Sequence, residues 1–288
     1  MVRPYAVKGR KLISWRVEEP APPEEEKVED ASDDGEREGD QAAFETGVEV
    51  EENEDERRTE EALDKIPVLP ITGPVDRAKR PGVIFVLEKA CLEVGKVGKN
   101  FQILNSDDHT NYLKKQNRNP ADYRPDIIHQ ALLAIFDSPL AKAGRLQAVY
   151  VKTEKGVLFE IKPHVRIPRT FKRFCGLMSQ LLQKLSITAV GKREKLLNVI
   201  KNPVTRHLPV NSKKIGLSYS SDKLVNLSNY VAAASDDAPL VFVVGAMAHG
   251  VISKEYIDDF VSVSKYPLSA ACCLNRICSA FEQKWKIT

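Results

Sequence analysis

The stretch "LVFVVGAMAHG", residues 240–250, begins as a run of apolar and β-branched residues and ends in a loop that contains Gly245 and Gly250. A short apolar run that is bounded by turn residues is typical of a strand buried on both faces. Such strands belong to parallel sheets covered by helices, and open sheets of this kind bind ligands at the carboxyl ends of their strands. The stretch therefore predicts an α/β fold with a candidate ligand loop after this strand.

The remainder of the chain from residue 81 alternates between strand-like and helix-like patterns. Strands are predicted at residues 82–88, 146–152, 157–162, 213–219 and 239–246, and the turn "TEKG" joins the second and third as a hairpin. Helices are predicted at residues 126–138, 170–185, 193–201, 222–234 and 268–285. Strands that are separated by helices predict an α/β fold with a largely parallel sheet.

The glycine loop, residues 245–250, excludes two common nucleotide sites. Its G-x-x-x-x-G spacing resembles a P-loop, but Val251 and Ile252 follow where that loop needs Lys and Ser or Thr. The G-x-G-x-x-G pattern of dinucleotide sites is also missing from the chain. The glycines alone are a weak signal, because Gly at a strand end is commonly only turn chemistry.

The charge of the chain is divided between two regions. Residues 18–64 hold 22 acidic and 4 basic residues, so the rest of the chain holds 39 of the 43 Lys and Arg but only 18 of the 40 Asp and Glu. The acidic region continues with Pro-rich sequence to residue 78, and residues 1–78 are predicted to be a disordered extension because so little apolar surface offsets the entropy of ordering. Residues 79–288 then form one basic domain, which favours a nucleic acid partner.

The stretch "VRIPRTFKRF", residues 165–174, concentrates base and aromatic around a predicted helix start. Phe171 and Phe174 begin an apolar stripe with helical spacing, so we interpret them as core anchors rather than as base-stacking platforms. Arg166, Arg169 and Arg173 are not explained by a core. Solvated surface charge is the alternative, but arginines beside a helix N-terminus favour a phosphate site.

Other polar residues have ordinary structural interpretations on sequence alone. Asp126, which follows Arg124, suits the first turn of a helix, and Ser269 suits the N-cap of the last helix. His129 and His249 are interpreted as structural rather than catalytic histidines. No Ser/His/Asp spacing or nucleophile elbow is present.

The five cysteines give no sign of a metal or a disulfide framework. No pair has CxxC spacing, and no finger-like arrangement of His and Cys occurs, so we expect no metal and buried thiols in a reducing compartment. The longest apolar runs, "VIFVL" and "LVFVVGAMA", are far shorter than a membrane span, so we expect no membrane contact.

Five motifs, in order along the chain, carry a family resemblance. They are "RPDIIHQALLAIFDSPLAKAG", "VRIPRTFKRFCGLMSQLLQKLSI", "VIKNP", "VFVVGAMAHG" and "YPLSAA". With them, residues 81–288 resemble the ribosome-biogenesis pseudouridine methyltransferases, which modify nitrogen-1 of a pseudouridine in small-subunit ribosomal RNA (18S). The resemblance does not include the acidic segment, residues 18–78.

That family belongs to the SPOUT, or α/β-knot, methyltransferases. The resemblance implies a trefoil knot near the C-terminus, a homodimer, and S-adenosylmethionine held in the knot loops. Some relatives carry a small polar residue at the position of Leu217, so backbone contacts are expected there. The implied cofactor-binding residues are Leu217, Gly245, Gly250, Val263, Ser264, Lys265, Tyr266, Pro267 and Leu268.

The resemblance also gives the basic residues a substrate. It implies that Arg124, Asp126, Arg166, Arg169 and Arg173 bind RNA, and that Asp126 helps to hold Arg124 or the target base. Our hypothesis is a direct transfer of the methyl group to nitrogen-1, an N–H that uridine lacks. Asp126 is the candidate catalytic residue, either orienting this N–H or accepting its proton.

Two other functions remain open at this point. The chain is either the methyltransferase, a non-catalytic RNA-binding assembly factor for the small subunit, or a methyltransferase for another RNA such as transfer RNA. The intact glycine loop and "YPLSA" favour the first. The expected partners are small-subunit ribosomal RNA, a second copy of the chain, and assembly factors or ribosomal proteins, and the expected location is the nucleus, in the nucleolus.

Overall fold

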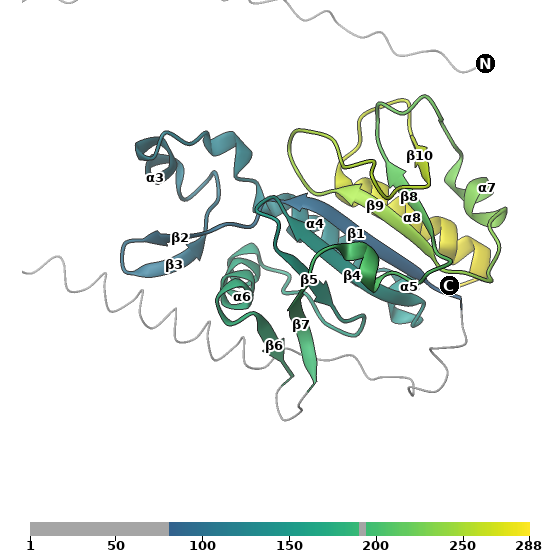
Figure 1. Cartoon of the computed structure of the whole chain (residues 1–288), viewed down its shortest axis with the longest axis horizontal. Coiled ribbons are helices and arrows are strands. Elements are labelled where there is room, and N and C mark those ends of the chain that lie inside the picture. Colours follow the sequence, from purple (N-terminus) through teal and green to yellow (C-terminus); the bar gives the residue numbers. More distant parts are fainter. Residues whose placement is uncertain (1–80, 190–193) are drawn as a thin grey trace, which may run out of the picture. The chain divides into compact units, whose positions relative to one another are not determined.

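An eight-stranded sheet organises residues 81–189 and 194–288, the part of the chain that the computed structural model describes (Figure 1). In spatial order its strands are β10 (Asp259–Val261), β8 (Lys213–Leu217), β9 (Leu240–Gly245), β1 (Val83–Ala90), β4 (Leu146–Thr153), β5 (Leu158–Ile161), β7 (Lys195–Ile200) and β6 (Ser186–Thr188). The predictions for the extension at residues 1–78 concern residues outside this described part.

The sheet is parallel on one side of β4 and antiparallel on the other. Strands β10, β8, β9, β1 and β4 pair in parallel, whereas β5, β7 and β6 continue the sheet in antiparallel pairs. The predicted hairpin at "TEKG" is confirmed by the β4–β5 pairing. The predicted α/β fold with a mostly parallel sheet is thus confirmed, with three strands added in antiparallel order at one end.

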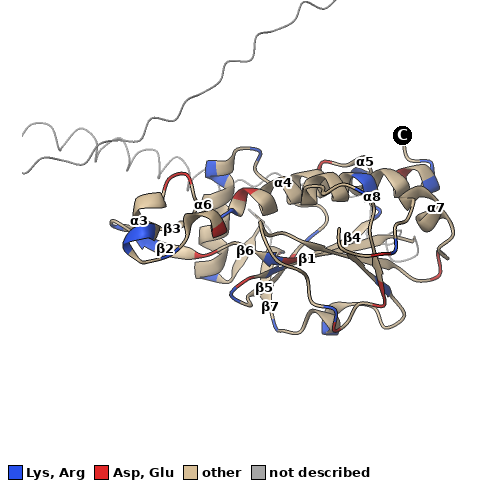
Figure 2. Cartoon of the chain, turned by 90° about the horizontal axis from the view of Figure 1, so that it is seen from above, with Lys and Arg blue, Asp and Glu red and all other residues tan. Residues whose placement is uncertain are grey.

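Helices cover one face of this sheet and loops cover the other. The helices are α4 (Pro125–Phe136), α5 (Pro139–Lys142), α6 (Phe171–Lys184), α7 (Leu227–Ala232) and α8 (Ala270–Trp285). Figure 2 shows α4, α5 and α8 along one side of the strands, and their apolar residues share one core with those of α6 and α7. A smaller core on the opposite face packs under the 3-10 helix η2 (Val204–His207) and the β9–β10 connection, residues 246–258. Because both faces are covered, β1 is buried continuously from Val83 to Glu88.

A small excursion separates β1 from α4. It contains the hairpin β2 (Val94–Val97) and β3 (Asn100–Ile103), the helix α3 (Thr110–Lys115) and the 3-10 turn η1 (Pro120–Asp122). The Ser179 hydroxyl of α6 donates a hydrogen bond of 3.0 Å to the Phe101 carbonyl of β3, which ties the hairpin to the helix layer. No pattern in the sequence analysis predicted these elements.

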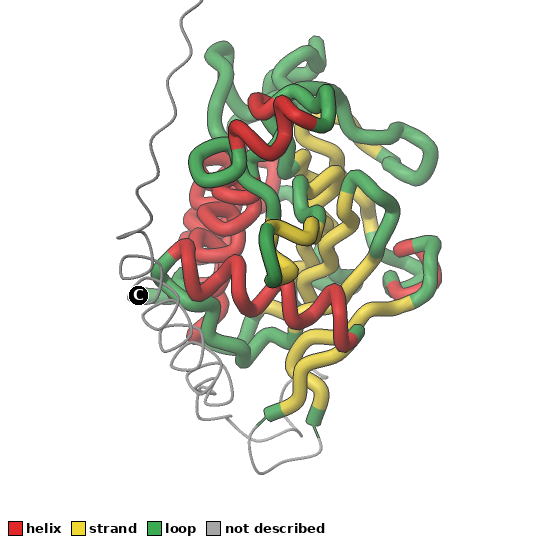
Figure 3. The backbone as a smooth tube through the Cα atoms, turned by 90° about the vertical axis from the view of Figure 1, so that its left-hand side faces the viewer, coloured by secondary structure: helices red, strands yellow, loops and turns green. Residues whose placement is uncertain are grey.

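The predicted helix at residues 193–201 is wrong. From Lys195 to Ile200 the chain forms β7, which pairs with β5 and β6, and α6 packs across this antiparallel end of the sheet (Figure 3). A short apolar run such as "KLLNVI" fits the spacing of a helix as well as that of a strand. Pairing with a strand on each side favours the strand here.

The predicted helix at residues 222–234 is shorter than expected. Helix α7 begins only at Leu227, after the Asn226 side chain accepts a hydrogen bond from the Asn229 N–H at 3.2 Å. The preceding residues are drawn toward β10 instead, because the Val225 N–H donates to the Ser262 carbonyl and the Ser262 N–H donates to the Lys223 carbonyl. Tertiary pairing therefore replaces the first turn of the expected helix.

The two phenylalanines of the stretch 165–174 anchor α6, as predicted. Phe174 is fully buried and its ring stacks on His129 with 4.5 Å between centroids, while Phe171 packs at the edge of the same core. His129 is itself buried, and its Nε2 forms a 2.8 Å hydrogen bond with the Pro168 carbonyl. The structural interpretation of His129 is therefore confirmed.

We predict that Phe174→Ala lowers the free energy of unfolding by about 3–5 kcal/mol, because it leaves a cavity between α6 and α4. Urea denaturation measures this difference. The matched control is Phe101→Ala, at a ring that is 56% exposed, for which we expect less than about 1 kcal/mol. Equal losses for the two variants contradict the prediction.

Candidate active site

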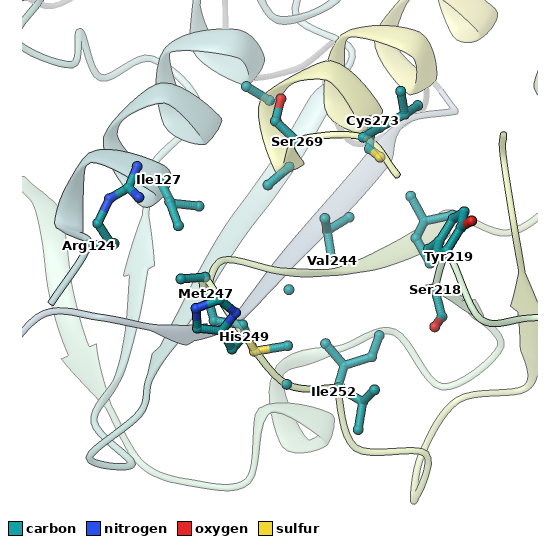
Figure 4. A pocket seen from close by; sticks show the side chains of 18 of the residues that line it. Arg124, Ile127, Ser218, Tyr219, Val244, Met247, His249, Ile252, Ser269 and Cys273 are labelled. Carbon is teal, nitrogen blue, oxygen red and sulfur yellow. The ribbon is translucent and has the colours of Figure 1, made fainter. Parts of the chain in front are cut away.

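A cavity of about 840 Å³ opens where the parallel strands end (Figure 4). Its walls come from the ends of β8 and β9, the β9–β10 connection, the segment from Ser262 to Ala271, and the start of α4. Because parallel strands share a direction, their carboxyl ends meet at one edge of the sheet and their connections surround one space. This volume lies within the usual range for small-molecule sites.

The glycine loop forms one wall of the cavity. At Gly245 an added Cβ would lie 2.9 Å from the Met247 Cε and 3.3 Å from the Ile252 Cγ2. Gly250 has a φ of 112°, a conformation that residues with a side chain rarely adopt. Gly250 is therefore required by the backbone conformation of the connection, whereas a Cβ at Gly245 would only make the Met247 or Ile252 side chain shift. The weak sequence signal has a structural cause at Gly250.

The N-terminus of α8 forms a second wall. Ser269 caps it by accepting a hydrogen bond of 3.2 Å from the Cys272 N–H, as the sequence predicted. The loop before it is held beside the loop that follows β8 by the hydrogen bonds between Ser262 and residues 223 and 225. The start of a helix presents unpaired N–H groups, which suits a carboxylate or another electron-rich group of a ligand.

Arg124 and Asp126 lie together at the rim of the cavity, at the start of α4. The guanidinium donates two hydrogen bonds to the carboxylate, from Nε to Oδ1 at 2.8 Å and from Nη2 to Oδ2 at 2.7 Å. This contact holds the pKa of Asp126 below its ordinary value, and burial opposes the shift without cancelling it. An acid in this state is a poor proton acceptor but a good clamp for the arginine.

The three other candidate RNA-binding arginines lie outside the cavity. Arg166 and Arg169 precede α6 and Arg173 is in its first turn, and all three are exposed. Arg169 Nη2 lies 3.3 Å from Asp137 Oδ2 in an ion pair whose side chains are mostly exposed. Such a pair is weak in water, so it leaves Arg169 able to exchange its partner for a phosphate.

The structure brings most of the predicted cofactor residues together around one cavity. Those that line the cavity are Leu217, Gly245, Gly250, Val263, Ser264, Tyr266 and Leu268, joined by Arg124 and Asp126. Lys265 and Pro267 do not line it, and both are exposed. His249 also lines it and is exposed, and its interpretation as structural rather than catalytic stays a prediction.

The other residues that line the cavity were not predicted as site residues from the sequence. They are Ser106, Ala121, Ile127, Gln130, Ser218, Tyr219, Ser220, Val244, Met247, Ala248, Val251, Ile252, Ser262, Ser269, Ala270, Ala271 and Cys273. Most are small or apolar residues next to a predicted loop, and proximity to those loops was the only available signal. Ser106 and Ala121 come from the excursion before α4, which had no signal at all.

One cysteine, Cys273, lines the cavity. Burial raises the pKa of Cys273 to about 11, so the thiol is neutral at physiological pH.

Within residues 81–189 and 194–288, no group of three or more His, Cys, Asp or Glu side chains is placed to hold a metal ion. No helix in that part of the chain is long and apolar enough to cross a membrane.

Comparison with known proteins identifies the family. The pattern described as EMG1/NEP1 methyltransferase matches residues 85–282. The chain is 51% identical over 210 residues to the "Ribosomal RNA small subunit methyltransferase NEP1" of Drosophila melanogaster, an alignment that covers 71% of this chain and 83% of that protein. The chain belongs to the EMG1/NEP1 methyltransferase family. The predicted family, and with it the prediction of a methyltransferase, are confirmed.

Other members of the EMG1/NEP1 family agree with this assignment. The NEP1 protein of Homo sapiens is 49% identical over 221 residues, covering 77% of this chain and 89% of the human protein. A crystal structure of Archaeoglobus fulgidus Nep1 bound to S-adenosylhomocysteine superposes with a TM-score of 0.59 at 23% identity, covering 71% of this chain and 99% of that one. At this identity the likeness supports the fold.

We predict that Asp126→Asn lowers the free energy of unfolding by about 1 kcal/mol near pH 7, because the charged hydrogen bonds to Arg124 are lost from a partly exposed pair. The pKa of Asp126 is lower in the folded chain than its ordinary value of 3.8. The stabilisation is therefore present above that value and is lost as the pH falls through the lower folded pKa.

Urea denaturation at several pH values measures the difference between wild type and variant, which should shrink below pH 3.8. Asp107→Asn is the control, since the exposed Asp107 carboxylate accepts only a 3.2 Å hydrogen bond from its neighbour Ser106. A difference for Asp126→Asn that grows as the pH falls is opposite in sign to the prediction.

Proposed function

We propose that this chain transfers a methyl group from S-adenosylmethionine to nitrogen-1 of a pseudouridine in small-subunit ribosomal RNA. The observation that carries the proposal is a cavity with the glycine loop on one side and the Arg124–Asp126 pair at its rim, in a member of the EMG1/NEP1 family. The names of the relatives from Drosophila melanogaster and Homo sapiens support the choice of RNA.

The residues of the cavity fit S-adenosylmethionine. Leu217, Val244 and Ile252 provide apolar surface for an adenine ring, while the serines that follow β8 and β10 provide hydroxyl groups. The N-terminus of α8 suits the carboxylate of the amino-acid part of the cofactor. The Archaeoglobus fulgidus relative binds S-adenosylhomocysteine, the demethylated product of this cofactor, and this supports the assignment.

When bound, S-adenosylmethionine supplies an electrophilic methyl group on a sulfonium. The task of the chain is then to hold the target base in line with that group and to keep water away, and good alignment is worth effective molarities on the order of 10⁵–10⁸ M. Arg124 at the rim is held by Asp126, so its remaining donors have a fixed direction toward an incoming base or phosphate. We assign Asp126 the role of positioning Arg124, in accord with its lowered pKa.

The exposed arginines extend the RNA surface away from the cavity. Arg166, Arg169 and Arg173 lie at the start of α6, where the helix dipole adds to their attraction for phosphate. Because the target base must leave its stack to enter the cavity, at a cost of a few kcal/mol, phosphate contacts outside the cavity offset that cost. The arginines and the cavity thus have complementary tasks.

Further features follow from family membership as proposals. They are a trefoil knot formed by the connections around β8, β9 and β10, a homodimer, contacts with small-subunit assembly factors or ribosomal proteins, and residence in the nucleolus. The return of the chain past β9 to add β10 at the far edge of β8 supports the knot. The close pairing of the loops at residues 223–225 and 262 supports it further.

The test is a methyl-transfer assay with labelled S-adenosylmethionine and two matched small-subunit RNA hairpins, one with pseudouridine and one with uridine at the target. We expect label only on the pseudouridine hairpin, because uridine has no N–H at nitrogen-1. Label on both hairpins contradicts the specificity. Tight binding of RNA without label on either supports the alternative, a non-catalytic assembly factor.

We predict that Arg166→Ala and Arg173→Ala each weaken binding of the pseudouridine hairpin and lower the salt dependence of its affinity. Each phosphate contact that is lost should reduce the slope of log K against log salt concentration by about 0.7–0.9. Filter binding over a range of salt concentrations measures this slope. Arg206→Ala is the control, because Arg206 is exposed on η2, which covers the opposite face of the sheet. A wild-type slope in all three variants rules out these phosphate contacts.

A further inference from the structure

Strand β1 contains one extra residue just before the cavity. Its partner in β4 advances by two residues, from Val151 to Thr153, while β1 advances by three, from Leu87 to Ala90. Leu87 and Ala90 both point into the helix-side core, so the strand's alternation is interrupted between them. The extra residue is Lys89, which is exposed and has a φ of 56°. This is a β-bulge, a feature that often redirects side chains beside active sites.

Glu88, the residue before the bulge, lies on the face of the sheet opposite to Leu87, as strand alternation places it, beneath the β9–β10 connection. Only 2% of Glu88 is exposed. Its Oε1 accepts a hydrogen bond of 2.7 Å from the Tyr256 hydroxyl, and its Oε2 accepts one of 3.2 Å from the Ser253 N–H. Its main-chain carbonyl accepts a third, of 2.8 Å, from the Ala246 N–H. One residue of β1 therefore binds the connection at three points.

A carboxylate this deeply buried needs its partners. Among the described residues no Lys, Arg or His forms an ion pair with Glu88, so the two donors of the connection are the groups that satisfy it. Burial and the neighbouring Glu88 raise the pKa of Tyr256 well above its ordinary value, so the Tyr256 hydroxyl keeps the proton that it donates. Removal of the carboxylate would leave two buried donors without an acceptor, and such donors lower the stability by their full desolvation free energy.

The residues between these anchor points are the ones that line the cavity. Ala246 is bound at one end and Ser253 at the other, and Met247 to Ile252 form the wall between them. The Lys89 side chain ends near the same loop, with its Nζ 4.0 Å from the position that a Cβ on Gly250 would occupy. Glu88 itself does not line the cavity. It touches the wall only from behind.

We propose that Glu88 is a positioning residue that holds the β9–β10 connection in its cofactor-binding shape through Ser253 and Tyr256. This inference rests on the proposed function, because it takes the connection to be a wall of the S-adenosylmethionine site. The inference predicts that Glu88, which does not line the cavity, affects how tightly the chain binds S-adenosylmethionine. The Tyr256 hydroxyl, which donates a hydrogen bond to Glu88, takes part in the same positioning.

The test compares four variants of the full chain by two measurements. Titration calorimetry gives the affinity for S-adenosylhomocysteine, and hydrogen exchange without ligand gives the protection of the Ser253 amide. We expect Glu88→Ala to weaken binding by about tenfold or more and Tyr256→Phe by about threefold, with faster exchange at Ser253 in both. Glu88→Gln should lie closer to wild type than Glu88→Ala, because its amide can accept from Ser253 and donate to the Tyr256 oxygen.

Tyr150→Phe is the matched control. Tyr150 is a buried tyrosine in the same small core, but its hydroxyl donates to the His207 carbonyl of η2 at 3.1 Å instead of to Glu88. Its removal should leave the affinity for S-adenosylhomocysteine and the exchange at Ser253 unchanged. If Glu88→Ala fails to fold, Tyr256→Phe against Tyr150→Phe decides the question alone.

The outcomes separate this inference from the proposed function. Wild-type affinity and wild-type Ser253 exchange in a folded Glu88→Ala or in Tyr256→Phe overturn the inference while the methyltransferase proposal stands. A wild-type chain that binds neither S-adenosylhomocysteine nor S-adenosylmethionine overturns the proposed function, and the inference that rests on it falls with it. Weaker binding in both variants, with Glu88→Gln between them and wild type, supports the inference.

Discussion

The parallel pairing of β1 with β4 on one side and β9 on the other is the constraint on which the rest of the structure depends. It buries β1 on both faces and gives the central strands one direction, so that β1, β8 and β9 end at the same edge. Helix α4, which follows the excursion after β1, and helix α8, which follows β10, begin at this edge, so both helices have their N-termini at the cavity. A ligand site with unpaired N–H groups and apolar walls follows from this direction alone.

The proposed RNA surface depends indirectly on the same packing. In the stretch 165–174 the helical period separates the aromatic side chains from the basic ones, so that Phe174 enters the core while Arg173 stays in solvent. His129 of α4 stacks on Phe174 and also bonds the Pro168 carbonyl, which fixes the path of the chain between Arg166 and Arg169. The arginines are thus presented by a helix whose orientation is set from the core beneath it.

Helices and strands could be predicted from the sequence where the apolar residues followed only one of the two spacings, helical or extended. The strand at 240–245 and the helix at 270–285 have patterns that no competing contact overrides, and their positions agree with the structure. At residues 195–200 the pattern was ambiguous, and pairing with β5 and β6, which is remote in sequence, decided the outcome. The glycine loop was visible because only glycine tolerates a φ of 112° at residue 250.

No pattern in the sequence predicted a role for Glu88. Acidic residues are rarely buried, and nothing in "VIFVLEKA" announces that a donor 168 positions away will satisfy this one. The bulge that follows it depends on the register between two strands, which cannot be read from either strand alone. A residue such as Glu88, which holds the wall of a site without lining the site, leaves no local sequence pattern. Such residues are therefore harder to predict than the residues that line the site.

The titratable groups of the cavity also bear on how the chemistry proceeds. The pKa of Asp126 is held low by Arg124, and the pKa of Cys273 is raised to about 11 by burial. The first is a carboxylate already engaged by two hydrogen bonds, and the second is a neutral thiol, so neither is suited to take a proton at neutral pH. With respect to these two groups, the cavity favours catalysis by alignment over catalysis by a base at Asp126 or Cys273. The geometry of the proposed cofactor loops then matters most, and the buried hydrogen bonds of Glu88 hold one of these loops, the β9–β10 connection, from behind.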